Sequence, residues 1–226
     1  PLYLGSKNLI GQITTLAAAF GVQASGALRY AEDVLSKSTI PAGAEGYFAV
    51  INQNAIARKI IDPRMADDGF RYRFAVSTVL DRLALVRTNV FYNPSMFKRG
   101  CHVVAQTASC VALLTAEQND NDIIIIPAQL GLGFKDHSPV DARCCVGSEE
   151  FCLGTVEVGS ILIANPERFL NNFSGLNIHC SGDVWNDSKV PKFASGQSTP
   201  GLTLDWVPDD ENDLFSGTAT GFLTNL

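Results

Sequence analysis

The sequence has few of the residues and patterns on which many enzyme families depend. Its 226 residues include only three histidines, and the patterns G-x-S-x-G, C-x2-C and G-x-G-x-x-G are all missing. Their absence argues against a serine-hydrolase elbow, an economical zinc site and a dinucleotide cradle. No apolar run approaches the roughly 18 residues of a membrane span. We therefore expect neither a resident cofactor or metal nor a direct contact with a membrane.

Charge is also scarce and is unevenly spread. Charged residues make up 18% of the chain, and the net charge of −6 argues against a direct nucleic-acid binder, which needs clustered Lys and Arg. Basic residues dominate between Arg58 and Arg99, whereas acids dominate from Cys145 onward. The two regions either neutralise each other within one subunit or join copies head to tail. The proposed basic flank is Arg58, Lys59, Arg71, Arg73 and Arg87, and the proposed acidic flank is Asp209, Asp210, Glu211 and Asp213.

The chain begins without the charged and apolar segments of a signal peptide, so we expect it to be made in the cytoplasm. An N-terminal proline amine can act as a general base, and the opening Pro1-Leu2-Tyr3-Leu4, followed by a helix, resembles that of the tautomerase family over about 20 residues. The resemblance implies an enzyme that uses Pro1. Because no second β-α-β unit follows, we interpret Pro1 instead as the residue left when an initiator Met is removed; processing from a longer precursor would leave the same start.

The first 44 residues predict a short helical segment. Leu9, Ile13, Leu16 and Phe20 follow a helical spacing, and a similar stripe resumes at Leu28 after a glycine-containing break at 21–26. We therefore predict two short helices.

From residue 45 the dominant period is two, which predicts strands. The clearest example is 70–80, for which a helix over 75–90 is the alternative; the β-branched and aromatic content favours strands. Further predicted strands are 47–52, 57–61, 83–92, 102–114, 122–126, 151–164, 176–180, 202–207 and 215–223. These predict a mainly β protein of α+β class, an antiparallel β-sandwich or barrel with a short N-terminal helical region. Within the domain 45–226, a polar loop or arm is expected at about 181–201.

The six cysteines need a separate explanation, because a chain of this length folds without crosslinks. They are Cys101, Cys110, Cys144, Cys145, Cys152 and Cys180. Buried free thiols are our preferred interpretation, and disulfides within or between subunits are the main alternative. A zinc site from His137 and the 144–152 cysteines has unfavourable spacing. The adjacent pairs Cys101-His102 and His179-Cys180 point to opposite faces of a strand, so neither forms a catalytic pair alone.

These observations together predict a non-enzymatic structural subunit of a larger assembly. We expect a viral or bacteriophage virion protein, such as a capsid, decoration or neck and tail component, located in the mature virion. Its partners would be other copies of itself and other structural proteins. The alternatives are a small cytosolic enzyme that uses Pro1 or a Cys/His site, and a β-rich ligand-binding module that uses Trp185 and Trp206.

Overall fold

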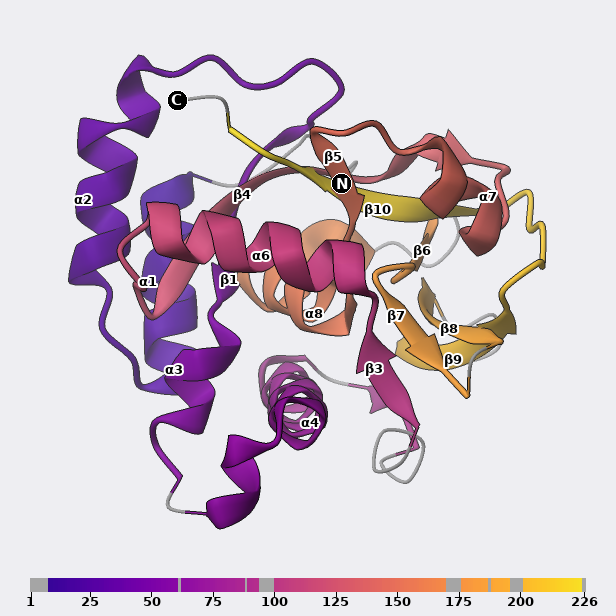
Figure 1. The fold of residues 1–226 in the computed structure, drawn as a ribbon, viewed down its shortest axis with the longest axis horizontal. Coiled ribbons are helices and arrows are strands. Elements are labelled where there is room, and N and C mark those ends of the chain that lie inside the picture. Colours follow the sequence, from indigo (N-terminus) through magenta and orange to yellow (C-terminus); the bar gives the residue numbers. More distant parts are fainter. Residues whose placement is uncertain are drawn as a thin grey trace.

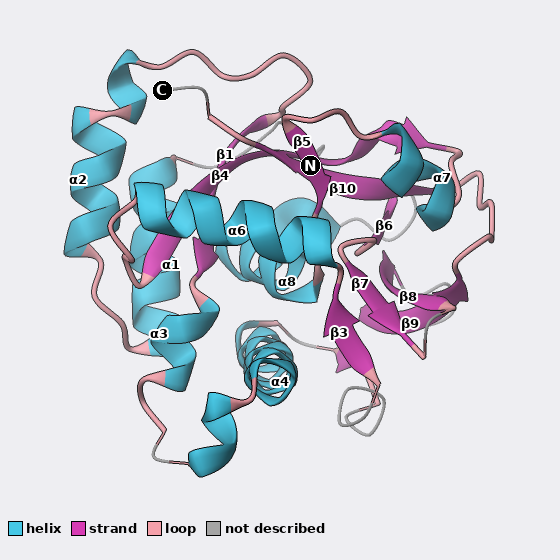
Figure 2. Ribbon diagram, viewed as in Figure 1, coloured by secondary structure: helices cyan, strands magenta, loops and turns pink. Residues whose placement is uncertain are grey.

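The chain folds as an α+β structure in which helices surround one mixed sheet (Figures 1 and 2). The computed structural model describes residues 8–60, 62–87, 89–93, 100–169, 176–186, 188–195 and 201–224. Pro1 lies outside these ranges, so the predicted role of its amine stays a prediction.

Seven helices are described. They are α1 (Leu9–Phe20), α2 (Ser25–Asp33), α3 (Gln53–Ala57), α4 (Asp68–Val86), α6 (Ala105–Glu117), α7 (Pro139–Cys145) and α8 (Thr155–Ala164). The prediction of two N-terminal helices is confirmed. The first begins where the Asn8 side chain accepts a hydrogen bond from Ile10 N, and it ends at Gly21, whose φ of 62° few other residues adopt at low cost.

The ten strands found among the described residues belong to a single sheet. They are β1 (Gly46–Ile51), β2 (Val90–Phe91), β3 (Cys101–Val103), β4 (Ile123–Lys135), β5 (Glu150–Cys152), β6 (Asn177–His179), β7 (Asp183–Trp185), β8 (Lys189–Ser195), β9 (Leu202–Pro208) and β10 (Ser216–Phe222). The main path runs β1-β4-β10-β6-β8-β7-β3, with β5 on β10 and β9 joining β8 to β2. Two pairings, β10 with β6 and β2 with β9, are parallel. The sheet is therefore not a closed barrel, and the predicted sandwich is not confirmed.

Helix α8 lies in the middle of the molecule, behind α6 in Figure 1. All ten of its residues are buried, and it packs against α4, α1 and β1. Strands β1 and β4 are almost wholly buried along Phe48–Ile51 and Ile123–Leu130, because helices cover both faces there. The N-terminal helices and the sheet thus share one hydrophobic core.

The predicted strand over 70–80 is wrong, because this segment lies in α4. The buried side chains Tyr72, Val76, Val79 and Leu83 follow the helical period. Asp67 starts the helix by accepting a hydrogen bond from Phe70 N at 2.5 Å. The alternation of aromatic and basic residues fits both periods over these few residues, and the burial of one helical stripe decides between them.

Other predicted strands are also helical in whole or in part. Residues 151–164 form only β5 before α8, and 102–114 form the end of β3 before α6. The strand predicted at 57–61 is replaced by the end of α3 and a turn over its described residues, and 83–92 by the end of α4 and the short β2. The polar arm predicted at 181–201 is wrong for its described part, which contains β7 and β8. Strands at 47–52, 122–126, 176–180, 202–207 and 215–223 are confirmed.

Candidate functional site: a buried carboxyl cluster

Three ionisable side chains from distant parts of the sequence meet beside Gly154. They are Tyr72 from α4, Glu157 from α8 and Asp183 from β7. Their exposed fractions are 4%, 4% and 0%. Burial of two carboxyls is costly unless donors compensate it, so the cluster is the most unusual chemistry in the described core.

The carboxyls are held by the start of α8. The N-cap of this helix is Gly154, which has no side chain to accept a hydrogen bond from the first turn. Asp183 supplies the missing acceptor from β7, since its Oδ2 accepts from Thr155 N at 2.8 Å. Glu157 reaches back from within the helix, and its Oε2 accepts from Gly154 N at 2.9 Å. The Tyr72 hydroxyl donates a short hydrogen bond to Asp183 Oδ1.

Two glycines allow this convergence. A Cβ on Gly154 would lie 2.5 Å from Asp183 Oδ1 and 2.6 Å from the Tyr72 hydroxyl oxygen. A Cβ on Gly182 would lie 2.6 Å from the carbonyl oxygen of Cys152 and 2.7 Å from Gly154 N. A side chain at Gly154 would therefore collide with the cluster itself, and one at Gly182 would collide with the backbone that leads into α8.

Burial changes the protonation of the pair. Burial, followed by the charge of Asp183, raises the pKa of Glu157 to about 7 from its ordinary value of 4.5. Burial raises the pKa of Asp183 to about 6 from 3.8, against the lowering effect of hydrogen bonds from Thr155 and Tyr72. Burial and the charge of Asp183 raise the pKa of Tyr72 well above 10. The cluster can therefore hold a proton near neutral pH.

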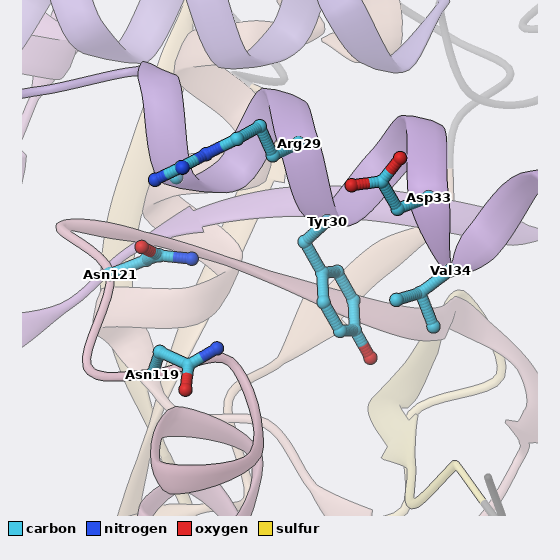
Figure 3. A pocket seen from close by; sticks show the side chains of 7 residues that line it. Arg29, Tyr30, Asp33, Val34, Asn119 and Asn121 are labelled. Atoms are coloured by element: carbon cyan, nitrogen blue, oxygen red, sulfur yellow. The ribbon is translucent and has the colours of Figure 1, made fainter.

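The described surface cavities do not reach this cluster. Figure 3 shows one of about 350 Å³ between α2 and the turn after α6, lined by Gly26, Arg29, Tyr30, Asp33, Val34, Asn119 and Asn121. Its Tyr30 hydroxyl donates to Glu117 Oε1 at 2.7 Å. A second cavity of similar volume is lined by Pro41, Ala42, Gly147, Ser148, Glu149, Glu150, Phe222 and Leu223. Neither brings the carboxyl pair into contact with solvent.

The six cysteines fall into two groups, and all are free thiols. Cys101, Cys110, Cys152 and Cys180 are buried, whereas Cys144 and Cys145 are exposed at the end of α7. Burial raises the pKa of each of the four buried thiols, which makes them poor nucleophiles. Cys101 and Cys180 lie close enough to Asp183 for its charge to contribute.

The three histidines lie in different environments. His102 is exposed beside the buried Cys101, so this adjacent pair diverges as expected for a strand. His137 is exposed, and its ring meets that of Phe134 edge to face at 5.8 Å. His179 is fully buried, and neither ring nitrogen has a hydrogen-bond partner among the described residues. Within those residues no group of three or more His, Cys, Asp or Glu is arranged to hold a metal ion.

Most of the proposed basic flank is engaged within the subunit. Arg58 pairs with Asp122, and Arg71 with Asp68. Lys59 donates to Phe20 O at 2.8 Å and also to Gly21 O, so it neutralises the carboxyl end of α1.

Arg87 does the same for α8, with Nη2 donating to the carbonyls of Leu162, Asn165 and Pro166. Arg73 is half-buried on α4. Burial raises the pKa of Cys101, and the charge of Arg73 acts in the opposite direction.

The proposed acidic flank is divided. Asp209 pairs with Arg143, and Asp213 lies 3.4 Å from Lys192 Nζ. Asp210 is exposed and Glu211 half-exposed, so these two remain at the surface. The flank is therefore only partly available to a neighbouring copy.

The two tryptophans predicted as a ligand platform do meet. Trp185 of β7 and Trp206 of β9 stack with ring centroids 5.0 Å apart, and Lys189 Nζ lies 5.5 Å from the centre of the Trp185 ring. Both rings are half-buried and pack against the core. The pair thus closes one end of the core as well as presenting an edge to solvent.

Sequence reasoning missed the carboxyl cluster. The local signal was Gly154-Thr155-x-Glu157, which has the spacing of a capping box without its capping side chain. Nothing in that signal identifies Tyr72 or Asp183, which lie far away in the chain.

No helix in the described part of the chain is long and apolar enough to cross a membrane. Comparisons with protein-family models, with curated proteins and with solved structures each find no match.

Proposed function

We propose that the chain is a non-enzymatic structural subunit that assembles with copies of itself and with other structural proteins of a viral or bacteriophage particle. The observation that carries the proposal is an exposed apolar surface on a tightly held backbone. The particle itself, whether capsid, decoration or neck and tail, is inferred from the turn-rich strands of the sequence.

The surface consists of Leu132, Leu214 and Phe215, which we call the β4–β10 patch. Their exposed fractions are 65%, 65% and 74%. Leu132 follows Gly131, which closely approaches Gly217, and Phe215 lies two residues before Gly217. The three side chains therefore belong to the same end of the β4–β10 pair. Large exposed apolar side chains grouped in this way are typical of protein–protein contact surfaces.

The part of the patch that contains Leu132 is held in place by one buried side chain, Gln129. The register between β4 and β10 shifts between Lys135 and Leu130, so residues 131–134 bulge outward. Gln129 fills the bulge: its Oε1 accepts from Gly131 N at 2.7 Å and Gly133 N at 3.1 Å. Its Nε2 donates to Thr218 O and Thr220 Oγ1, both at 2.9 Å. A preorganised surface loses little entropy when a partner binds.

The ionisable core supports the same proposal. Turnover requires reactive groups that reach a substrate, whereas Asp183, Glu157 and Tyr72 are buried, Tyr72 donates to Asp183, and Glu157 accepts from Gly154 N. The buried thiols are held in their protonated form. The arrangement is that of a structural core.

The test is the oligomeric state of the purified chain. Light scattering over a wide concentration range should show association, and the double variant Leu214→Ser/Phe215→Ser should remain a monomer because the apolar contact is lost. Leu85 and Leu113 have exposed fractions of 74% and 61% on α4 and α6. The matched double variant Leu85→Ser/Leu113→Ser should associate like the unsubstituted chain.

The proposal would be contradicted if the unsubstituted chain stayed strictly monomeric at high concentration and also failed to bind particle proteins. Equal association of both double variants would place the contact elsewhere and remove its main support.

A further inference from the structure

We propose that the chain contains a proton-dependent latch. The Asp183–Glu157–Tyr72 cluster holds β7, α8 and α4 together while at least one of its carboxyls is protonated, and the junction loosens when both carboxyls are ionised. The buried His179 has the opposite dependence on pH. This inference does not depend on assembly, and it would hold for a monomer.

The geometry makes the junction sensitive to charge. Asp183 and Glu157 approach Gly154 from two elements whose backbones touch at Gly182. The described ion pairs do not include either carboxyl. Two carboxylates in this space repel each other in a medium that screens charge weakly, so protonation of either carboxyl relieves the repulsion.

The groups facing the pair offer little positive charge. From α4 comes Tyr72, a hydrogen-bond donor, and from β3 come Cys101 and the exposed His102, whose charge favours ionised Asp183. Cys180 lies beside them as a thiol. Arg73 is near enough to act on Cys101. The proton on the pair is therefore the main source of neutralisation.

The sign follows from the two states of the chain. The folded pKa values of about 7 and about 6 lie above the ordinary values of 4.5 and 3.8 that apply when the chain is unfolded. Between about pH 4 and pH 7 the folded state thus holds more protons than the unfolded state. Stability from this cluster is fully present in acid and is lost as the pH rises through that window.

His179 has the opposite sign. It lies on β6 between β8 and β10, opposite Lys192 and Thr218 and near Asp213. Burial, followed by the charge of Lys192, lowers its pKa to about 4 from 6.5. Its contribution is present at neutral pH and is lost as the pH falls from about 6.5 through 4.

His179 therefore offsets only part of the effect of the two carboxyls in mild acid. Below about pH 6.5 His179 is more protonated in the unfolded chain than in the folded chain. The carboxyl pair is more protonated in the folded chain than in the unfolded chain. Above that pH only the carboxyl pair still titrates. Because the carboxyl pair carries two raised pKa values and His179 offsets only one of them, we expect stability to fall with rising pH from 4.5 to 8, more steeply below pH 6.5 than above it.

Urea unfolding at closely spaced pH values from 4.5 to 8 tests this, because the slope of stability with pH counts the protons exchanged. Glu157→Gln keeps an acceptor for Gly154 N and removes one titrating group, so the slope should change by about one proton and stability should become nearly independent of pH below 6.5, where Asp183 and His179 balance each other. His179→Leu should make the fall with rising pH steeper by about one proton. Asp210→Asn, at an exposed acid, should follow the unsubstituted chain.

Slopes for Glu157→Gln and His179→Leu that match the unsubstituted chain would overturn the proposal. If Glu157→Gln does not fold, hydrogen exchange of the unsubstituted chain decides. Peptides covering Gly154 and Asp183 should lose about tenfold protection relative to β4 between pH 5 and pH 8, after correction for intrinsic exchange. Equal changes in both regions would show that the junction has no separate response.

Discussion

The ionisable groups of the carboxyl cluster and of the His179 site are similarly buried, but they differ in their hydrogen bonds. Asp183 and His179 are both 0% exposed and lie four residues apart, on β7 and β6. Asp183 receives hydrogen bonds from Thr155 N and Tyr72, whereas the His179 ring has no hydrogen-bond partner among the described residues. Burial alone therefore does not determine what a polar group contributes, because the donors and acceptors around it decide whether its removal costs or gains stability.

The largest expected effect comes from forcing the carboxyl junction apart. Gly182→Ala should lower the free energy of unfolding by about 3 kcal/mol, because its Cβ would meet backbone atoms that cannot turn away. Chemical denaturation measures the loss. Gly147→Ala is the matched control, since nothing lies within 4 Å of a Cβ there. A similar, small effect for both variants would show that the crossing is not tight.

Removing the acid from the intact junction comes next. Asp183→Ala leaves Thr155 N and the Tyr72 hydroxyl without their acceptor, so we expect a loss of about 2 to 3 kcal/mol at pH 5. At pH 8 the loss should be smaller, because the substitution also removes repulsion with Glu157. Unfolding curves at the two pH values check this. A larger loss at pH 8 would contradict the sign assigned to the cluster.

A milder change removes only one donor. Tyr72→Phe keeps the ring in the core and deletes the hydrogen bond to Asp183, so stability should fall by about 1 kcal/mol. Because that hydrogen bond favours ionised Asp183, the fall of stability with rising pH should become steeper. Thermal unfolding across the pH range measures both. An unchanged profile would show that the hydroxyl does not bind the carboxylate.

The smallest effect is expected at His179. His179→Leu removes no described hydrogen bond, so at pH 7.5 its stability should lie within about 1 kcal/mol of the unsubstituted chain. At pH 5 the variant should be the more stable of the two, because it has no ring that must stay neutral. A large loss at pH 7.5 would show that the His179 ring stabilises the fold in a way that its described hydrogen bonding does not explain.

Sequence reasoning was reliable where the local pattern had one interpretation. The helical stripe of α1 ends at a glycine with the required backbone conformation, and the strands β1, β9 and β10 lie between clear turn residues. It failed for α8, since a helix buried on all sides shows no amphipathic period and its Val and Ile residues resemble a buried strand. It failed for α4, where alternation over 70–80 matched a strand by coincidence.

By itself, then, the sequence determined the N-terminal helices and about half of the strands, because these depend on neighbouring residues and composition. Only the tertiary structure decided that α8 is helical, that Cys144 and Cys145 alone among the cysteines are exposed, and that Tyr72, Glu157 and Asp183 meet. The physical reason is the separation of the interacting residues along the chain. The buried cluster joins α4 to β7 across 111 residues and β7 to the start of α8 across 28, and its stability depends on the low dielectric and close backbone contact that exist only after those elements pack.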